Sequence, residues 1–278
     1  TDEIKRLYKI GSTFVINKPR TDTLKEGLVG YWSFDGPDMA QSTNKFALDR
    51  SGNNNTGTLT NGPTKAIGKI GQALEFDGSN DSVDSNANVL NPSTIDFTVS
   101  AWFKTDALGA AEQHVISQAD GGGTGRTWMY IEDTASGSVF ETFLGGSETV
   151  GSALAANTWY HGVITKSGTS IVMYLDGKQD ASSTKTVESA AGITRIGIQK
   201  AGSSPFNGKI DEVRIYNRVL TPDEIKRLYK IGSTFVINKP RTDTLKEGLV
   251  GYWSFDGPDM SQSTNNVWAI DRSGQGNN

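Results

Sequence analysis

The chain has 278 residues with 27 basic and 31 acidic side chains, a net charge of −4, and no cysteine. The basic residues are scattered, which excludes a nucleic-acid-binding patch that neutralises phosphates, and the lack of thiols excludes disulfides and zinc–thiolate sites. No apolar stretch approaches the ~20 residues of a membrane-spanning helix, so we expect no membrane span and no nucleic-acid partner.

The many glycines and the alternating apolar residues predict short strands joined by tight turns. The first strand is Gly27–Asp35, followed by a loop over Leu48–Gly62 that contains a short strand at Gly57–Thr60. The most regular alternation lies in Asp96–Thr105. The same pattern predicts strands at Gln72–Asp77, Asp81–Asp84, Gln113–Gln118, Arg126–Glu132, Ser138–Leu144, Thr158–Lys166, Ser170–Leu175, Thr194–Gln199 and Gly208–Tyr216.

One short helix is predicted after the last of these strands. Thr221–Glu224 is a capping box with proline at the first helical position, and Ile225, Leu228 and Tyr229 recur on one face before Gly232 ends the helix. The pattern therefore indicates an all-β unit that one C-terminal helix closes.

The chain also contains a long internal repeat. Asp2–Met39 is identical to Asp223–Met260, an offset of 221 positions, and solenoid repeats are only about 20–50 residues long. The copies then diverge, and Asp49–Gly52 recurs as Asp271–Gly274 after one extra residue. We therefore expect a piece of a tandem array, in which each unit is a whole domain. Its parts are the end of a preceding repeat with its linker (1–26), one complete domain (27–232), a linker (233–247) and the start of the next repeat (248–278).

Six separated elements occur in the order typical of one family. They are GLVGYWSFD (27–35), SGNNNTGTL (51–59), GKIGQALEFDGSNDSVD (68–84), DFTVSAWF (96–103), NTWYHGVITKSGTSIVMYLDGK (157–178) and FNGKIDEVRIYNRVLTPDEIKRLY (206–229). In these elements the chain resembles laminin-G-like domains of the concanavalin A-like lectin and glucanase group. The resemblance implies a two-sheet antiparallel jelly-roll sandwich with adjacent first and last strands, and with a concave face and rim loops for ligands.

The resemblance also implies a structural Ca²⁺ that ties the end of the first strand to the last strand. The matching ligands are Asp35 and Asp211, with Asp77 and Gly78 as further ligands. Ca²⁺ takes six to eight oxygen ligands, which carboxylates and loop carbonyls supply. The alternative is that these acids cap turns or pair with Lys209 and Arg214.

Carbohydrate binding needs exposed aromatic side chains beside fixed hydrogen-bond partners. The aromatic candidates are Trp102, Trp128 and Tyr130. In lectin-like relatives a second Ca²⁺ sits at the rim, and the matching positions are Asn80, Asp81 and Glu132. The alternative is that the aromatic side chains pack between the sheets.

Glycan hydrolysis needs two carboxylates roughly 5–10 Å apart across the scissile bond. Glu132 and Glu141 come nearest to such a pair, but the laminarinase-type signature is missing, so we predict that the chain is not an enzyme. His161 is predicted to be a structural strand residue, and His114 a strand residue that faces solvent.

Together these observations predict a non-enzymatic, tandem-repeat protein of a prokaryotic cell surface, extracellular, serving as a structural fibre or an adhesion module. The expected partners are neighbouring repeats or copies of the chain itself, in a filament or by strand exchange, and surface glycans. The alternative is a calcium-dependent glycan-binding module of a carbohydrate-active enzyme.

Overall fold

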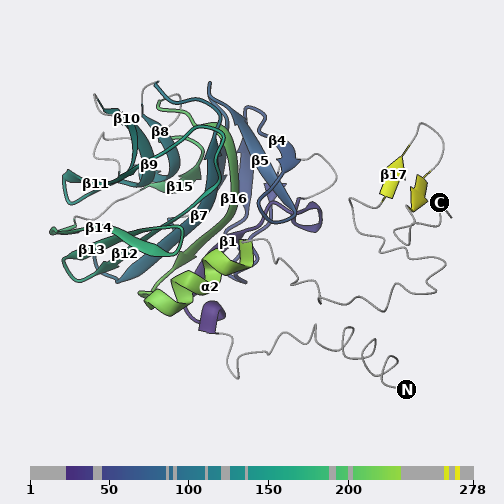
Figure 1. Ribbon diagram of the computed structural model, residues 1–278. Helices are drawn as coiled ribbons and strands as arrows, with labels where there is room; N and C mark the ends of the chain where they lie inside the picture. The colour runs from purple at the N-terminus through teal and green to yellow at the C-terminus, as the bar shows by residue number, and fades with distance from the viewer. Residues whose placement is uncertain are drawn as a thin grey trace, which may run out of the picture. The chain divides into compact units, whose positions relative to one another are not determined.

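The structure is a computed structural model that forms two compact units, Pro19–Thr234 and a second made of Thr1–Lys18 with Phe235–Asn278. The larger unit contains two eight-stranded β-sheets and the helices that pack beside them (Figure 1). The structure describes residues 23–39, 46–85, 88–89, 93–109, 112–119, 126–134, 137–187, 192–199, 203–232, 260–262 and 267–269.

Sheet A of the larger unit has eight strands. They are β1 (Leu28–Trp32), β4 (Thr64–Ile67), β5 (Gln72–Asp77), β7 (Phe97–Thr105), β12 (Tyr160–Ser167), β13 (Ser170–Leu175), β14 (Lys178–Thr184) and β16 (Asn207–Tyr216). Their order is β14-β13-β12-β7-β16-β5-β4, and β1 also pairs with β16. All these pairings are antiparallel, and the first strand lies beside the last as predicted.

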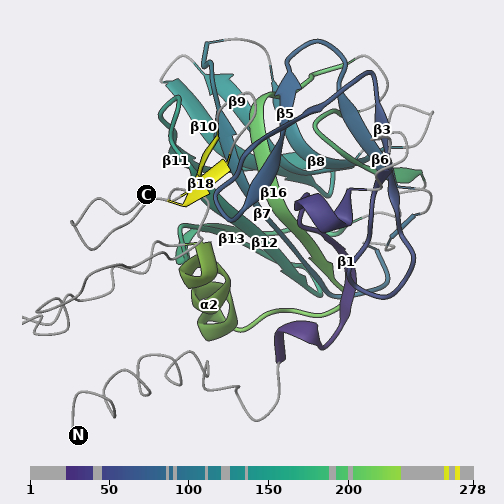
Figure 2. The ribbon, with the colours of Figure 1, turned by 90° about the vertical axis from the view of Figure 1, so that its right-hand side faces the viewer.

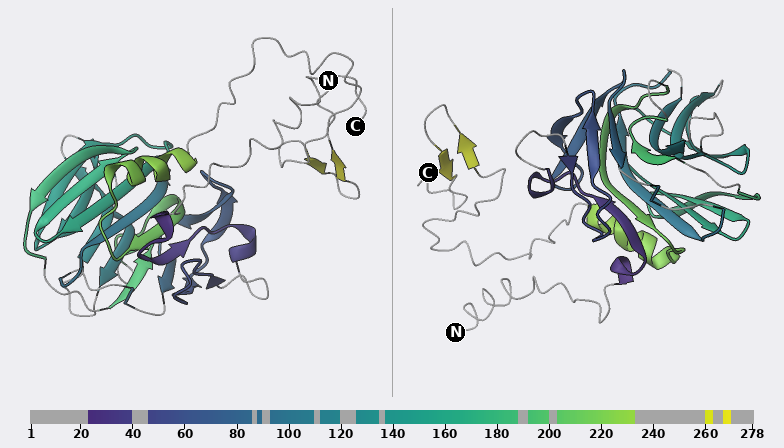
Figure 3. Two further views of the ribbon diagram at one scale, coloured as in Figure 1. Left: turned by 90° about the horizontal axis from the view of Figure 1, so that it is seen from below. Right: turned by 180° about the vertical axis from the view of Figure 1, so that it is seen from behind.

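Sheet B also has eight strands, stacked on sheet A (Figure 3). They are β2 (Phe46–Ala47), β3 (Gly57–Thr60), β6 (Ser82–Ser85), β8 (Gln113–Ala119), β9 (Arg126–Thr134), β10 (Gly137–Leu144), β11 (Ser147–Ala153) and β15 (Ile193–Ile196). Their order is β11-β10-β9-β8-β15-β6-β3-β2. The predicted all-β, two-sheet antiparallel sandwich is confirmed, whereas β2, β4, β11 and β14 were not predicted.

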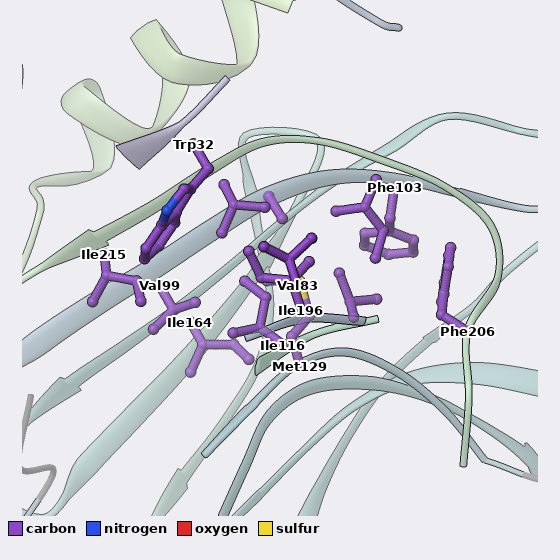
Figure 4. Close-up of a cluster of buried hydrophobic side chains, with 14 of the residues drawn as sticks. Trp32, Val83, Val99, Phe103, Ile116, Met129, Ile164, Ile196, Phe206 and Ile215 are labelled. Carbon is purple, nitrogen blue, oxygen red and sulfur yellow. The ribbon is translucent and has the colours of Figure 1, made fainter. Parts of the chain in front are cut away.

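The main core lies between the two sheets. Because side chains alternate between the faces of a strand, Val99, Ile164 and Ile215 of sheet A point toward Ile116 and Met129 of sheet B (Figure 4). All five are completely buried. Burial of each such side chain stabilises the fold by roughly 1.5–3 kcal/mol.

A second, smaller core lies on the outer face of sheet A, where α2 (Pro222–Gly232) covers the strands (Figure 2). Ile225 and Leu228 of the helix pack on Val163 and Tyr216. The 11-residue helix is confirmed where its sequence signals placed it. Among the described residues no helix is long and apolar enough to cross a membrane.

The capping box at the start of α2 supplies acceptors to two backbone N–H groups. The backbone N–H of Thr221 donates to Glu224 Oε2 at 2.9 Å, and the N–H of Glu224 donates to Thr221 Oγ1 at 3.3 Å. We expect Thr221→Ala to lower the free energy of unfolding by about 1 kcal/mol, because one N–H at the helix start loses its acceptor. Urea denaturation measures this loss, and Thr221→Ser, which keeps the hydroxyl, should restore most of it.

In the second unit the structure describes one hairpin, β17 (Met260–Gln262) with β18 (Val267–Ala269). Its Met260–Ala269 pairing repeats the Met39–Ala47 bridge of the larger unit. The local pairing is thus retained although the second copy has an extra residue. The linker 233–247, the rest of 248–278 and residues 1–22 lie outside the described residues, and so does the predicted packing of the chain ends on neighbouring copies.

Candidate functional site

Asp35 and Asp211, two of the predicted calcium ligands, hold the turn between β4 and β5. Asp35 Oδ1 accepts a hydrogen bond from the N–H of Gln72 at 3.0 Å, and Asp211 Oδ2 accepts from the N–H groups of Lys69 and Ile70 at 2.8 and 2.9 Å. The contact requires glycine at position 71, where φ is +57° and a Cβ would lie 2.2 Å from Asp35 Oδ1. Both acids therefore accept hydrogen bonds from the same turn. Asp35 follows the first strand, and Asp211 lies in the last strand.

Asp77 and Gly78 lie at the other end of β5. Asp77 pairs with Asn207 at the start of β16, and its Oδ1 accepts from the N–H of Ser79 at 2.8 Å. The two ends of this six-residue strand are roughly 17 Å apart at 3.3–3.4 Å per residue. The structure thus brings together two of the four predicted ligands. Within the described residues no cluster of three or more His, Cys, Asp or Glu side chains is arranged to hold a metal ion.

The electrostatics of Asp211 favour a counter-charge at this turn. Its side chain is completely buried, and Oδ1 has no hydrogen-bond partner. Burial raises the pKa of Asp211 to about 8, the N–H of Ile70 opposes that rise, and the charges of Glu212 and Asp35 add to it. One carboxylate oxygen of Asp211 is therefore available to a cation, and the hydrogen bonds to the turn fit the structural alternative. Lys209 and Arg214, which the alternative reading paired with these acids, pair with Glu75 and Glu212 instead.

Trp102 and His161 lie side by side on the outer face of sheet A, beneath α2. The Trp102 ring stacks on Tyr229 of the helix at 5.5 Å and 22° and lies 5.0 Å from His161. His161 is completely buried with Ser100 Oγ 3.0 Å from Nε2, and burial lowers its pKa to about 3. Trp102 is therefore a packing residue rather than an open ligand platform, and His161 has the structural role predicted for it.

The outer face of sheet B carries a second polar cluster. Met129 and Ile131 point into the core, so Tyr130 between them points outward. Its hydroxyl donates to Glu141 Oε2 at 2.7 Å, and its ring stacks on His114 at 5.2 Å and 16°.

The prediction that His114 faces solvent is wrong. It is 1% exposed, because the Tyr130 ring covers it, and its Nε2 lies 3.1 Å from Glu112 Oε2. Burial lowers the pKa of His114. A side chain can thus point away from the main core and still be covered by its neighbours.

Glu132 and Glu141 are in direct contact on this face. Burial raises the pKa of Glu141, and so does its hydrogen bond to Glu132. The paired carboxyls of glycosidases are 5–5.5 or 6.5–9.5 Å apart, with the sugar between them, whereas Glu132 and Glu141 lie within hydrogen-bonding reach of each other. Trp128 belongs to β9, and its side chain lies outside the described residues.

Of the three predicted rim residues Asn80, Asp81 and Glu132, only Asp81 lines a cleft. The cleft has a volume of about 370 Å³ and contains Asp77 and Asp81. Asp81 Oδ2 accepts from the N–H of Asp77 at 3.1 Å, and burial raises the pKa of Asp81. The carbonyl of Asn80 accepts from Asn61 Nδ2 at 2.9 Å. Glu132 is not among the lining residues, which are Asn61, Gly62, Thr64, Glu75, Phe76, Asp77, Asp81, Asp106 and Asn207.

The sequence did not identify several side chains of this rim cleft. Glu75, Asp106 and Asn207 line the cleft. Lys209 does not line it, but its Nζ donates to Glu75 Oε1 at 2.7 Å and lies 3.9 Å from Asp106 Oδ2. Asn207 and Asp106 come from two different strand ends that meet at the cleft. Of the cleft residues, only Asn61 had a local sequence signal. The dipeptide at 61–62 is typical of a turn, and Asn61 has a φ of +64°.

Comparison with known proteins relates the chain to lectin-like domains. The family profile of the concanavalin A-like lectin/glucanases superfamily matches residues 77–226. Adhesion G-protein coupled receptor V1 of Danio rerio is 26% identical over an alignment of 166 residues, which covers 55% of this chain and 3% of the receptor. The chain therefore spans a small part of that relative.

Solved structures share the fold. Domain 4 of AbnA, an extracellular arabinanase from Geobacillus stearothermophilus, solved with arabinotriose, is 22% identical with a TM-score of 0.54, covering 73% of this chain and 98% of that one. The binding domain of Paraclostridial Mosquitocidal Protein 1 is 19% identical with a TM-score of 0.57, covering 74% and 52%. Trypanosoma rangeli sialidase in complex with sialic acid is 19% identical with a TM-score of 0.57, covering 73% and 32%.

Proposed function

The chain belongs to the concanavalin A-like lectin/glucanases superfamily, and on that premise we propose that it is a non-enzymatic adhesion module of an extracellular protein, with glycans as ligands. The rim cleft carries this proposal. The prokaryotic cell surface is the proposed location, and the identical segments 2–39 and 223–260 support a tandem array of such modules.

The rim cleft has the size and the hydrogen-bonding groups of a small carbohydrate site, although its one aromatic lining residue, Phe76, is buried. Its volume of about 370 Å³ lies within the 300–1,000 Å³ usual for ligand pockets. Carboxylates of Glu75 and Asp106 and the amides of Asn61 and Asn207 line it, and such groups hydrogen-bond sugar hydroxyls. Lys209 pairs with both carboxylates and so holds them in place before a ligand arrives.

The contact between Glu132 and Glu141 supports the non-enzymatic part of the proposal. Two carboxyls that share a hydrogen bond leave no room between them for a glycosidic bond and a water molecule. Binding is then the role of the domain. Tandem units raise the overall affinity of weak sites by roughly 10²–10⁴ where geometry permits simultaneous contact.

The rim cleft can be tested with defined oligosaccharides. We expect the 278-residue chain to bind at least one member of a panel that includes arabinotriose, and Asp106→Ala to weaken that binding at least tenfold. Isothermal titration calorimetry measures both. Asp223→Ala is the matched control, because the Asp223 side chain is 93% exposed on α2. Binding that Asp106→Ala leaves unchanged, or no binding by any member of the panel, would refute the proposed site.

A structural fibre of the same repeats is the second candidate function. It is favoured by a separate observation at the junction of α2 and β1, where the repeated residues surround a second cleft.

A further inference from the structure

A cleft of about 530 Å³ lies between β1, η1 (Thr23–Lys25) and α2. We call it the junction cleft. Its apolar lining residues are Leu24, Leu28, Leu228 and Ile231, and its polar ones are Lys25, Tyr31, Arg50, Ser51 and Arg214. Ile231 is 47% exposed, so the junction cleft has a large apolar side chain that is open to a partner.

The walls of the junction cleft are held by hydrogen bonds within the unit. Arg218 donates from Nε to the carbonyl of Glu26 at 2.8 Å and pairs with Glu224 at 2.9 Å. Arg227 donates to Thr23 Oγ1 at 3.1 Å. η1, which precedes β1, is therefore fastened to the helix that ends the same unit (Figure 2), and the cleft exists before any partner binds.

The two arginines of the junction cleft have acidic partners within the unit. Arg50 pairs with Asp38, and Arg214 pairs with Glu212 while its guanidinium lies 4.3 Å from the Tyr31 ring. An anionic ligand would have to compete with these internal acids. Leu24 and Leu28, which are half-buried, and the exposed Ile231 are therefore the apolar side chains that the cleft offers, and they favour an apolar occupant.

The two copies of the repeat preserve the lining of the junction cleft. Lining residues 24, 25, 28 and 31 recur at positions 245, 246, 249 and 252, and residues 228 and 231 recur at positions 7 and 10. Arg50 and Ser51 recur as Arg272 and Ser273, although the stretch before them has diverged, with Phe46 replaced by Trp268. Arg214 is the one lining residue whose counterpart falls outside the 278 residues.

We propose that the junction cleft binds the same surface of a second copy of the unit, with Ile231 of each copy inserted into the cleft of the other. A two-fold contact requires a self-complementary surface, and this surface carries both an exposed apolar side chain and an apolar cleft.

In an array the contact would need little intrinsic affinity. Residues 233–243 join the end of one unit to the counterpart of Thr23 in the next, and they span at most about 40 Å, which corresponds to millimolar effective concentrations.

Self-association of the 278-residue chain tests this inference independently of glycan binding. We expect sedimentation velocity to show a dimer that forms with rising concentration, and Ile231→Glu to lower the association constant at least tenfold without moving the thermal unfolding midpoint. Ile67→Glu is the matched control, because Ile67 is 86% exposed on the edge strand β4. A chain that stays monomeric, or an equal effect of Ile67→Glu, would overturn the proposal.

A disulfide test locates the contact without relying on a disruptive substitution. Because the chain has no cysteine, each variant Ile231→Cys or Ser51→Cys has a single thiol. Under mild oxidation we expect a mixture of the two variants to form intermolecular disulfides at least five times faster than Ile231→Cys mixed with Val150→Cys. Val150 is 52% exposed on β11 of sheet B. Equal rates in the two mixtures would place the contact elsewhere and contradict the proposal.

Discussion

Replacing Trp102 by alanine is expected to lower the free energy of unfolding by about 3–5 kcal/mol, because a fully buried aromatic side chain is removed and a cavity is left. Trp102 is 1% exposed and packs between His161 and Tyr229. A Cβ on Gly232, the last residue of α2, would lie 2.6 Å from the Trp102 indole. The helix thus ends directly on this ring, and loss of the ring should loosen its attachment to sheet A.

Guanidinium denaturation measures the loss of stability, and hydrogen exchange of the α2 amides measures the loosening. Trp102→Phe is the control, because Trp102 Nε1 has no hydrogen-bond partner, so phenylalanine loses volume but no hydrogen bond. We expect phenylalanine to cost less than half as much as alanine. If alanine costs under 1 kcal/mol, or if exchange in α2 is unchanged, the helix does not depend on this ring.

The strands that the sequence failed to predict share a position in the fold. β14 and β4 are the edges of sheet A, and β11 and β2 are the edges of sheet B. Their side chains are mostly exposed or half-buried, so they lack the alternation of apolar residues that reveals a strand with one buried face. Central strands such as β7 have that pattern. The helix was predictable for another reason, because its capping box is a local signal.

For the candidate sites too, the sequence predicted some contacts and missed others. The order of the first and last strands was sufficient to bring Asp35 and Asp211 together, because these strands pair directly in the sheet. Asp77 also pairs with the last strand, at Asn207. However, the full length of the six-residue strand β5 separates Asp77 and Gly78 from the turn that Asp211 binds. The rim cleft combines side chains from three distant parts of the chain, including Asn61 and Asn207, and no local spacing encodes that meeting.

The substitution Asp211→Asn is expected to change the dependence of stability on pH. The pKa of Asp211 is about 8 in the folded chain, against an ordinary value of 3.8 for an aspartate side chain. At a pH below 3.8 the carboxyl is protonated in both states, and its contribution to stability is fully present. As pH rises to 8 the unfolded chain releases this proton before the folded chain does, so stability falls by up to about 1.4 kcal/mol per pH unit. Asp211→Asn removes that slope, and urea denaturation at pH 4.5, 6 and 7.5 measures it.

Calcium should reverse this effect if the two acids at the β4–β5 turn bind it. A cation favours the ionised carboxyl, so 5 mM Ca²⁺ at pH 7.5 is expected to raise the unfolding temperature of the unsubstituted chain and to leave Asp211→Asn unchanged. Saturation at a hundred times the dissociation constant would add about 2.7 kcal/mol. Asp223→Asn, on the exposed face of α2, is the matched control and should respond as the unsubstituted chain does.

Asparagine retains an oxygen that can accept from the N–H groups of Lys69 and Ile70, so the hydrogen bonds to the turn survive the substitution. Any difference between the two chains then comes from the charge rather than from a lost hydrogen bond. An equal response of both chains to calcium would place the ion elsewhere. No response in either would leave turn capping as the role of Asp35 and Asp211, and an unchanged pH slope would show that Asp211 is ionised when folded.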